Sequence, residues 1–126
     1  MSDAVIYHMC KAEEWAVALG QGRYAGSSQD QADGFIHFST RDQVWTSAAK
    51  HRRGQPGILL LSVDAAKLGN ALKWEPSRGG QLFPHLYAPL DVALVIETTP
   101  LPLGQDGVHE FPEGFPPPPR EPDAEA

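Results

Sequence analysis

Three of the five histidines lie in or beside segments whose composition is typical of strands or extended chain. His8 falls in the first of these segments, His37 in the second and His85 in a later one. An unperturbed imidazole titrates near pH 6.5, so it can donate or accept a proton near neutrality. A lone histidine of this kind is usually a hydrogen-bonded structural residue, but three around a shared hollow would form a ligand site capable of acid–base chemistry.

Side-chain alternation along a strand predicts which polar groups accompany these histidines. In the segment 35–39, His37 and Ser39 share one face of the strand. Ile36 and Phe38 share the other face. If those apolar side chains enter the core, His37 and Ser39 point together toward a cleft. In the later extended run, His85 and Tyr87 likewise share a face. The two hydroxyl groups would add hydrogen bonds to the same pocket.

Two other chemistries compete with this interpretation. Three histidines can hold a catalytic zinc, which would make the protein a metal-dependent hydrolase. However, the chain has no His-x-x-x-His and no cysteine pair, so no metal ligand is assigned. Cys10 is the single cysteine, which excludes an internal disulfide and suits a reducing cytosol. It could be a nucleophile beside a helix N-terminus, although filling the corner between strand and helix is the simpler role.

Hydrophobic periodicity predicts an α+β domain with two main helices, at about 11–19 and 41–52. In the first helix, the apolar stripe is expected to comprise Ala12, Trp15, Ala16 and Leu19. Thr40 and Gln43 resemble a capping box at the start of the second helix. Strands or extended segments are expected at 5–9, 35–39, 58–63, 72–75, 82–90 and 92–98, and the most apolar of them, 58–63, is expected at the centre of a sheet.

The chain divides by composition into a single domain over residues 1–103 and an acidic, proline-rich tail over residues 104–126. The tail holds six of the twelve prolines and has six acids and one base. It has no apolar periodicity, so we expect it to be flexible.

The charge pattern limits the partners. The net charge is −6, and without the tail the charges nearly cancel, which disfavours nucleic acid as a partner. The basic run 50–53 could bind an anion, or it could offset a helix dipole. No apolar run approaches a membrane span and no signal peptide is visible. We therefore expect a cytoplasmic protein that does not bind membranes.

Four ordered blocks, at 6–8, 34–40, 73–76 and 82–90, resemble a bacterial family catalogued as a domain of unknown function, number 952 in its series. The resemblance covers about Val5 to Leu103. It implies a fold similar to that of ADP-ribosyltransferases: a small, split, mainly antiparallel sheet that grips NAD in a cleft. Tyr7-His8 would then match the first motif, with His8 on the adenosine ribose.

The same resemblance implies roles for the later blocks. Ser39 and Thr40, with His37 just before them, would lie near the nicotinamide. The third motif normally supplies a glutamate that stabilises an oxocarbenium-like transition state, and here the matching stretch offers His85. Glu75 or Glu97 would have to replace that carboxylate, although neither matches by position. A related activity is phosphotransfer like that of RNA 2'-phosphotransferases, for which the candidate phosphate contacts are Arg23, Arg41 and Arg78.

The sequence hypothesis is thus a nucleotide-cleft protein, acting as an ADP-ribosyl- or phosphotransferase-like enzyme with NAD or a related nucleotide as substrate rather than as a resident cofactor. Two alternatives stay open: a non-catalytic small-ligand-binding or interaction module, and the metal-dependent hydrolase. The assigned catalytic residues are His37 and His85, and the assigned ligand-binding residues are His8, Ser39, Thr40 and Tyr87.

Overall fold

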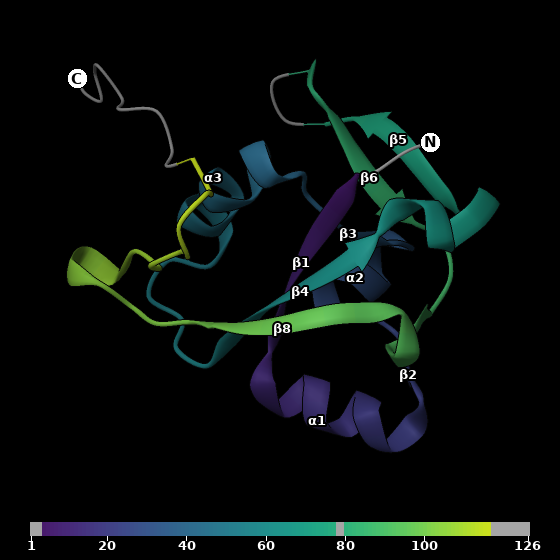
Figure 1. The fold of residues 1–126 in the computed structure, drawn as a ribbon, viewed down its shortest axis with the longest axis horizontal. Coiled ribbons are helices and arrows are strands. Elements are labelled where there is room, and N and C mark those ends of the chain that lie inside the picture. Colours follow the sequence, from purple (N-terminus) through teal and green to yellow (C-terminus); the bar gives the residue numbers. More distant parts are fainter. Residues whose placement is uncertain (1–3, 78–79, 117–126) are drawn as a thin grey trace.

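A three-stranded antiparallel sheet crosses the middle of the molecule (Figure 1). The computed structural model describes residues 4–77 and 80–116. The sheet has the order β1 (Val5–Lys11), β4 (Ile58–Asp64) and β8 (Val95–Leu101). Every residue of β1 pairs with β4, from Val5 opposite Asp64 to Lys11 opposite Ile58. The central position predicted for 58–63 is confirmed, because apolar side chains cover both of its faces.

Two smaller antiparallel sheets stand beside this one. The first has the order β3 (Ile36–His37), β6 (Leu82–Leu86) and β5 (Leu72–Pro76), and the second pairs β2 (Arg23–Tyr24) with β7 (Leu90–Asp91). An isolated bridge between Tyr7 and Ser39 joins β1 to the end of the β3 segment. The prediction of a mixed α+β fold with mainly antiparallel strands is therefore confirmed.

Three α-helices complete the fold: α1 (Ala12–Gln21), α2 (Ser28–Asp33) and α3 (Arg41–His51). Short 3-10 helices lie at η1 (Ala65–Ala71), η3 (Val92–Leu94) and η4 (Gln105–Gly107). The Thr40 backbone N–H donates to the Gln43 side chain over 3.0 Å, as the capping-box prediction required. The two longer helices, α1 and α3, are the two main helices predicted.

The central sheet carries apolar cores on both faces. One cluster contains Ile6, Leu61 and Val63, together with Trp15 of α1. The other contains Tyr7, Ile58 and Leu60, with Val44 of α3. Alternate residues of β1 and β4 thus supply opposite cores, so the sheet fixes α1 and α3 on its two sides.

Two predicted details of α1 and β8 are wrong. Helix α1 buries Trp15 and Ala18, whereas Ala16 and Leu19 are exposed. The face that packs on the sheet is therefore shifted by one residue toward the N-terminus from the predicted apolar stripe. The strand predicted at 92–98 begins only at Val95. The Asp91 carboxylate accepts a hydrogen bond from the Ala93 N–H over 2.9 Å and starts the 3-10 turn η3 there.

Residues 104–116, placed in the flexible tail by the sequence prediction, pack against the domain. Phe111 and Phe115 lie against the second core cluster, and the His109 side chain is buried. Arg41 lies over the Phe115 ring at 4.7 Å and donates to the Gly114 carbonyl oxygen over 3.2 Å. The folded unit therefore extends beyond Leu103, because aromatic contacts offset the proline-rich composition. The rest of the predicted tail, 117–126, lies outside the described residues.

None of the helices in the described ranges 4–77 and 80–116 is long and apolar enough to cross a membrane.

Candidate functional site

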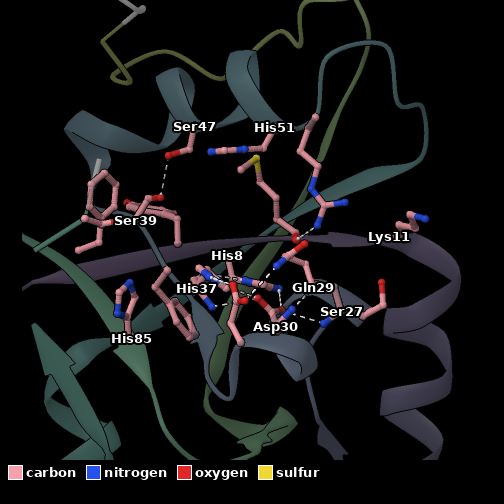
Figure 2. Close-up of a pocket in the computed structure, with 18 of the residues that line it drawn as sticks. His8, Lys11, Ser27, Gln29, Asp30, His37, Ser39, Ser47, His51 and His85 are labelled. Atoms are coloured by element: carbon pink, nitrogen blue, oxygen red, sulfur yellow. Dashed lines mark hydrogen bonds and ion pairs between the residues drawn. The ribbon is translucent and has the colours of Figure 1, made fainter. Parts of the chain in front are cut away.

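An open groove of about 860 Å³ runs between α3 and the α2–β3 segment, beside the edge strand β1 (Figure 2). Ser47 and His51 approach it from α3, and Asp30 and His37 approach it from the opposite side. β1 passes along it from Tyr7 to Lys11. Beyond the bridge at Ser39, this edge of β1 pairs with no strand among the described residues, which leaves room for the groove.

Asp30 organises the wall formed by α2 and β3. It closes a capping box with Ser27, whose backbone N–H donates to Asp30 Oδ2 over 2.7 Å. Asp30 Oδ1 accepts the His37 backbone N–H over 3.1 Å and His37 Nδ1 over 2.5 Å. Gly26 makes this packing possible, since its φ is +99° and a Cβ there would stand 2.7 Å from the Asp30 Cβ.

Two carboxylates stabilise the protonated form of His37. Its Nδ1 faces Asp30, and its Nε2 lies 3.0 Å from Asp33 Oδ2. The hydrogen bond to Asp30 raises the pKa of His37, against the opposing effect of partial burial. Burial alone would raise the pKa of Asp30, but hydrogen bonds from the His37 ring and from the backbone N–H groups of Ser27 and His37 lower it to about 2. The two carboxylates therefore favour the protonated ring, which lines the groove with 38% of its side-chain surface exposed.

His8 is buried, and both of its ring nitrogens are engaged within the protein. Nδ1 donates to the His37 carbonyl oxygen over 2.6 Å, and Nε2 accepts from the Tyr24 hydroxyl over 2.8 Å. Burial lowers the pKa of His8, with Asp30 opposing, and burial raises the pKa of Tyr24. This geometry offers no free ring nitrogen for the ribose contact that the resemblance implied. His8 instead ties β1 to β3 and to β2.

His85 lies next to His37, and its Nδ1 is likewise backed by a carboxylate. Its Nδ1 donates to Glu75 Oε1 over 2.8 Å, and the Tyr87 hydroxyl donates to the same oxygen over 2.7 Å. The Phe35 ring stacks on His85 at 4.1 Å between centroids. The His37 and His85 ring centroids are 5.6 Å apart. Three histidines expected to share a hollow, His8, His37 and His85, therefore all line one groove.

The remaining assigned residues differ in position. Ser39 is buried, lines the groove and lies 3.3 Å from the Ser47 hydroxyl. Thr40 caps α3 and is absent from the groove lining. Tyr87 lines a separate cavity of about 230 Å³ beside Phe35. Glu75 is the carboxylate that reaches His85, whereas Glu97 is an exposed residue of β8 opposite Ser62.

Sequence reasoning missed Asp30 and Lys11 as charged groups of the groove, and it left the role of the basic run 50–53 open. The signal for Asp30 was present, since Ser27-x-x-Asp30 is a capping-box pattern. The basic residues of the groove are Lys11, His51 and Arg52. His51 and Arg52 belong to the basic run 50–53, for which the sequence left two roles open: binding an anion or offsetting a helix dipole.

Several other candidates have structural partners instead. Burial raises the pKa of the Cys10 thiol to about 11, which removes the thiolate that a nucleophile needs. Arg41 donates to the Tyr7 hydroxyl over 3.0 Å, and Arg23 lies in β2. Arg78 lies outside the described residues. Within residues 4–77 and 80–116, no group of three or more His, Cys, Asp or Glu side chains is arranged to hold a metal ion.

The fold and the groove together define a small α+β protein with a histidine-lined groove. A sequence model of the family described as "Protein of unknown function (DUF952)" matches residues 9–98. The chain belongs to this family, as the four sequence blocks indicated.

Solved structures show the same fold. The crystal structure of protein CC0527 from Caulobacter crescentus is 50% identical, with a TM-score of 0.83 over 84% of this chain and 93% of that chain. The solution NMR structure of CC0527 is 51% identical, with a TM-score of 0.75 over 82% of this chain and 90% of that one. No curated protein matches this chain. The likeness to ADP-ribosyltransferases is therefore carried by the sequence resemblance alone.

Proposed function

We propose that the groove binds a nucleotide-type ligand, NAD or a relative of it, and that His37 and His85 act as an acid–base pair in a transferase or hydrolase reaction on it. One observation carries the proposal: two imidazoles, each with Nδ1 hydrogen-bonded to a carboxylate, lie 5.6 Å apart in the lining of one groove. A ligand atom in contact with one ring is within reach of the other.

The two histidines are suited to complementary steps. The Asp30 carboxylate raises the pKa of His37, which favours the proton-donor role toward a leaving group. Glu75 holds the proton on Nδ1 of His85, so Nε2 is the acceptor for a proton from water or a ligand hydroxyl. A ligand oxygen that receives the proton from His37 Nε2 would take the place of Asp33, whose side chain is 37% exposed.

This arrangement favours phosphotransfer or phosphoester hydrolysis over the other reaction that the resemblance implies. A positive charge forming at a ribose carbon is repelled by the imidazolium of His37, since like charges at short range in a partly dry site interact unfavourably. The nearby carboxylate of Glu75 already accepts from two donors. A phosphoryl group, by contrast, is stabilised by a cationic donor.

Binding and turnover assays with separate histidine variants test the proposal. Calorimetry with NAD, ADP-ribose and a 2'-phosphorylated oligonucleotide identifies the ligand, and chromatography of long incubations detects products. We expect His37→Gln and His85→Gln each to reduce turnover at least 100-fold, as loss of a general acid or base does. Glu97→Gln, on the exposed strand β8, is the control. Failure of all three ligands to bind, or turnover that survives both histidine variants, contradicts the proposal.

A second candidate, a ligand-binding module without catalysis, is favoured by one contact. His37 Nε2 is already 3.0 Å from Asp33, so neither ring nitrogen of His37 is free in this conformation. If binding occurs without products, and Asp33→Asn does not produce turnover, this candidate replaces the enzyme proposal.

A further inference from the structure

We propose that a phosphate-binding subsite lies in the groove opposite the α2–β3 wall. It is formed by His51 and Arg52 at the end of α3, with Lys11 at the end of β1. It takes a phosphate ester or pyrophosphate group, the anionic part of the ligand. The inference rests on the proposed function for the ligand that carries this group, but the subsite itself can be tested with inorganic pyrophosphate.

Arg52 is the best-placed residue of this wall. Its side chain is half-buried, with Nη2 donating to the Met9 carbonyl oxygen over 3.1 Å and Nη1 donating to Gln55 Oε1 over 3.0 Å. A guanidinium has five N–H donors in a rigid, planar fork, so these two bonds fix its plane and leave donors for a ligand. Such a fork matches two oxygens of a phosphate at once.

No carboxylate neutralises this charge in the described part of the chain. The ion pairs found there all involve histidines on the other wall, and neither Lys11 nor Arg52 lies within 4 Å of an acidic oxygen. Glu14 also lines the groove, yet its buried Oε1 has no hydrogen-bond partner. Among the described residues, Lys11 and Arg52 therefore have no direct ion-pair partner, which leaves both cations able to pair with an anion that enters the groove.

The segment after Leu103 holds Gln55, the side-chain partner of Arg52, in place. His109 is buried, and its Nε2 donates to the Gln55 carbonyl oxygen over 2.7 Å. The Gly54 N–H donates to the Gly107 carbonyl oxygen over 2.8 Å, and Arg53 donates to the Asp106 carbonyl oxygen over 3.2 Å. Because Gln55 orients the guanidinium, we assign His109 and Gln55 as positioning residues for the subsite.

The placement of the two walls sets the ligand class. His51 faces His37 and Asp30 across the groove, and Lys11 lies at the end of β1 (Figure 2). A ligand that reaches both walls needs a strongly anionic group on one side and a bond open to proton transfer on the other. A groove of about 860 Å³ is the size of sites that hold drug-sized ligands. A nucleoside diphosphate or dinucleotide has this size and this separation of charge.

Pyrophosphate titration of the full chain at low salt, followed by calorimetry, tests the subsite. We expect Arg52→Gln to weaken binding at least tenfold and Lys11→Gln about threefold. Lys50→Gln is the matched control, because Lys50 lies on α3 and is exposed outside the groove. Glu14→Gln removes a carboxylate from the groove and should tighten binding. Arg52→Lys keeps the charge without the fork and should bind with intermediate affinity.

The positioning role has its own readout. Gln55→Ala and His109→Gln should weaken pyrophosphate binding severalfold in the Arg52 protein, but should change nothing further when added to Arg52→Gln. The subsite is overturned if Lys50→Gln weakens binding as much as Arg52→Gln does, if pyrophosphate does not bind, or if folded Arg52→Gln binds like wild type.

The two proposals fail separately. Pyrophosphate binding that depends on Arg52, without turnover of any nucleotide, leaves the subsite standing and removes the acid–base function. Turnover that depends on His37 and His85, with pyrophosphate binding insensitive to Arg52, leaves the acid–base function standing and removes the subsite.

Discussion

The two walls of the groove hold positive charge in different ways. On the α2–β3 wall, His37 is charged because Asp30 and Asp33 face its two ring nitrogens. On the α3 wall, Arg52 is held by a backbone carbonyl and a neutral amide. A carboxylate-paired cation has its charge compensated within the protein, whereas one held by neutral groups still lacks a counterion. This difference suits the first wall to proton transfer and the second to anion binding.

The two walls also differ in their dependence on pH. The charge of His37 belongs to a titrating pair, while an arginine stays protonated throughout the range in which proteins fold. Stability contributed by the first wall should therefore change with pH, and that contributed by the second should not.

Removing Asp30 should have the largest effect on stability. Asp30→Ala leaves His37 without its main partner and opens the Ser27 capping box. Breaking a buried, hydrogen-bonded charge pair costs about 3 kcal/mol of unfolding free energy. Urea unfolding followed by circular dichroism measures the loss.

The matched control for Asp30 is Asp33→Asn on the same helix. Its side chain is partly exposed, and exposed ion pairs contribute less than about 1 kcal/mol. Equal losses in the two variants would show that Asp30 does not organise this wall.

The pH profile of stability is the second prediction. The pKa of Asp30 is lowered from 3.8 to about 2, so its contribution is complete above pH 3.8 and is lost as the pH falls toward 2. That contribution is about 2 kcal/mol by linkage. The pKa of His37 is raised from 6.5, so its contribution is complete below pH 6.5 and is lost as the pH rises through the shifted value.

Burial lowers the pKa of His8, so stability should also fall as the pH drops below 6.5, and unfolding free energies should be greatest near pH 6.5. Asp30→Asn should flatten the alkaline flank of the profile, because Asp30 is the chief cause of the His37 shift, and should remove the additional loss below pH 3.8. A profile in Asp30→Asn that matches wild type would contradict the assignment.

The contacts of Phe111 with α3 should contribute less to the free energy of unfolding than Asp30 does. Phe111 lies 5.0 Å from Trp45, centroid to centroid, and is half-buried. Phe111→Ala should cost about 1–2 kcal/mol, less than a fully buried phenylalanine, and this cost should not vary between pH 4 and pH 8. Phe111→Leu keeps most of the volume and should recover much of the loss. A pH-dependent cost would show that the two walls are coupled.

The sequence was sufficient where local physics decides the outcome. Alternation placed His37 and Ser39 on the groove side while Ile36 and Phe38 entered the core. The prediction for 35–39 held because a strand with one buried face has only one register that buries it. The apolar run 58–63 became the central strand for a different reason, since both of its faces are apolar and each is buried in a core.

Other features depended on contacts that are distant in sequence. Asp30 is one acid in a polar stretch, and only the fold turns it toward His37 and His8. Likewise, Phe111 and His109 occur in a proline-rich segment whose composition predicted flexibility. They became ordered because α3 offers Trp45, and the following loop offers the Gln55 carbonyl. Composition does not reveal such surfaces on the rest of the chain.

The smallest expected effect is a change in the tautomer of His85 that leaves His37 unchanged. Glu75 accepts from His85 Nδ1, and this contact favours the tautomer with the proton on that nitrogen. Glu75→Gln keeps the shape of the side chain but removes the full negative charge. Nitrogen-15 NMR of the His85 ring at a pH where it is neutral should then show more of the Nε2–H tautomer, while His37, which is paired with Asp30, should not change. Because the Glu75 side chain is partly exposed, at 36%, and an exposed ion pair contributes little, stability should barely respond. An unchanged tautomer ratio at His85 would mean that Glu75 does not orient this imidazole, and the base role would then have no structural support.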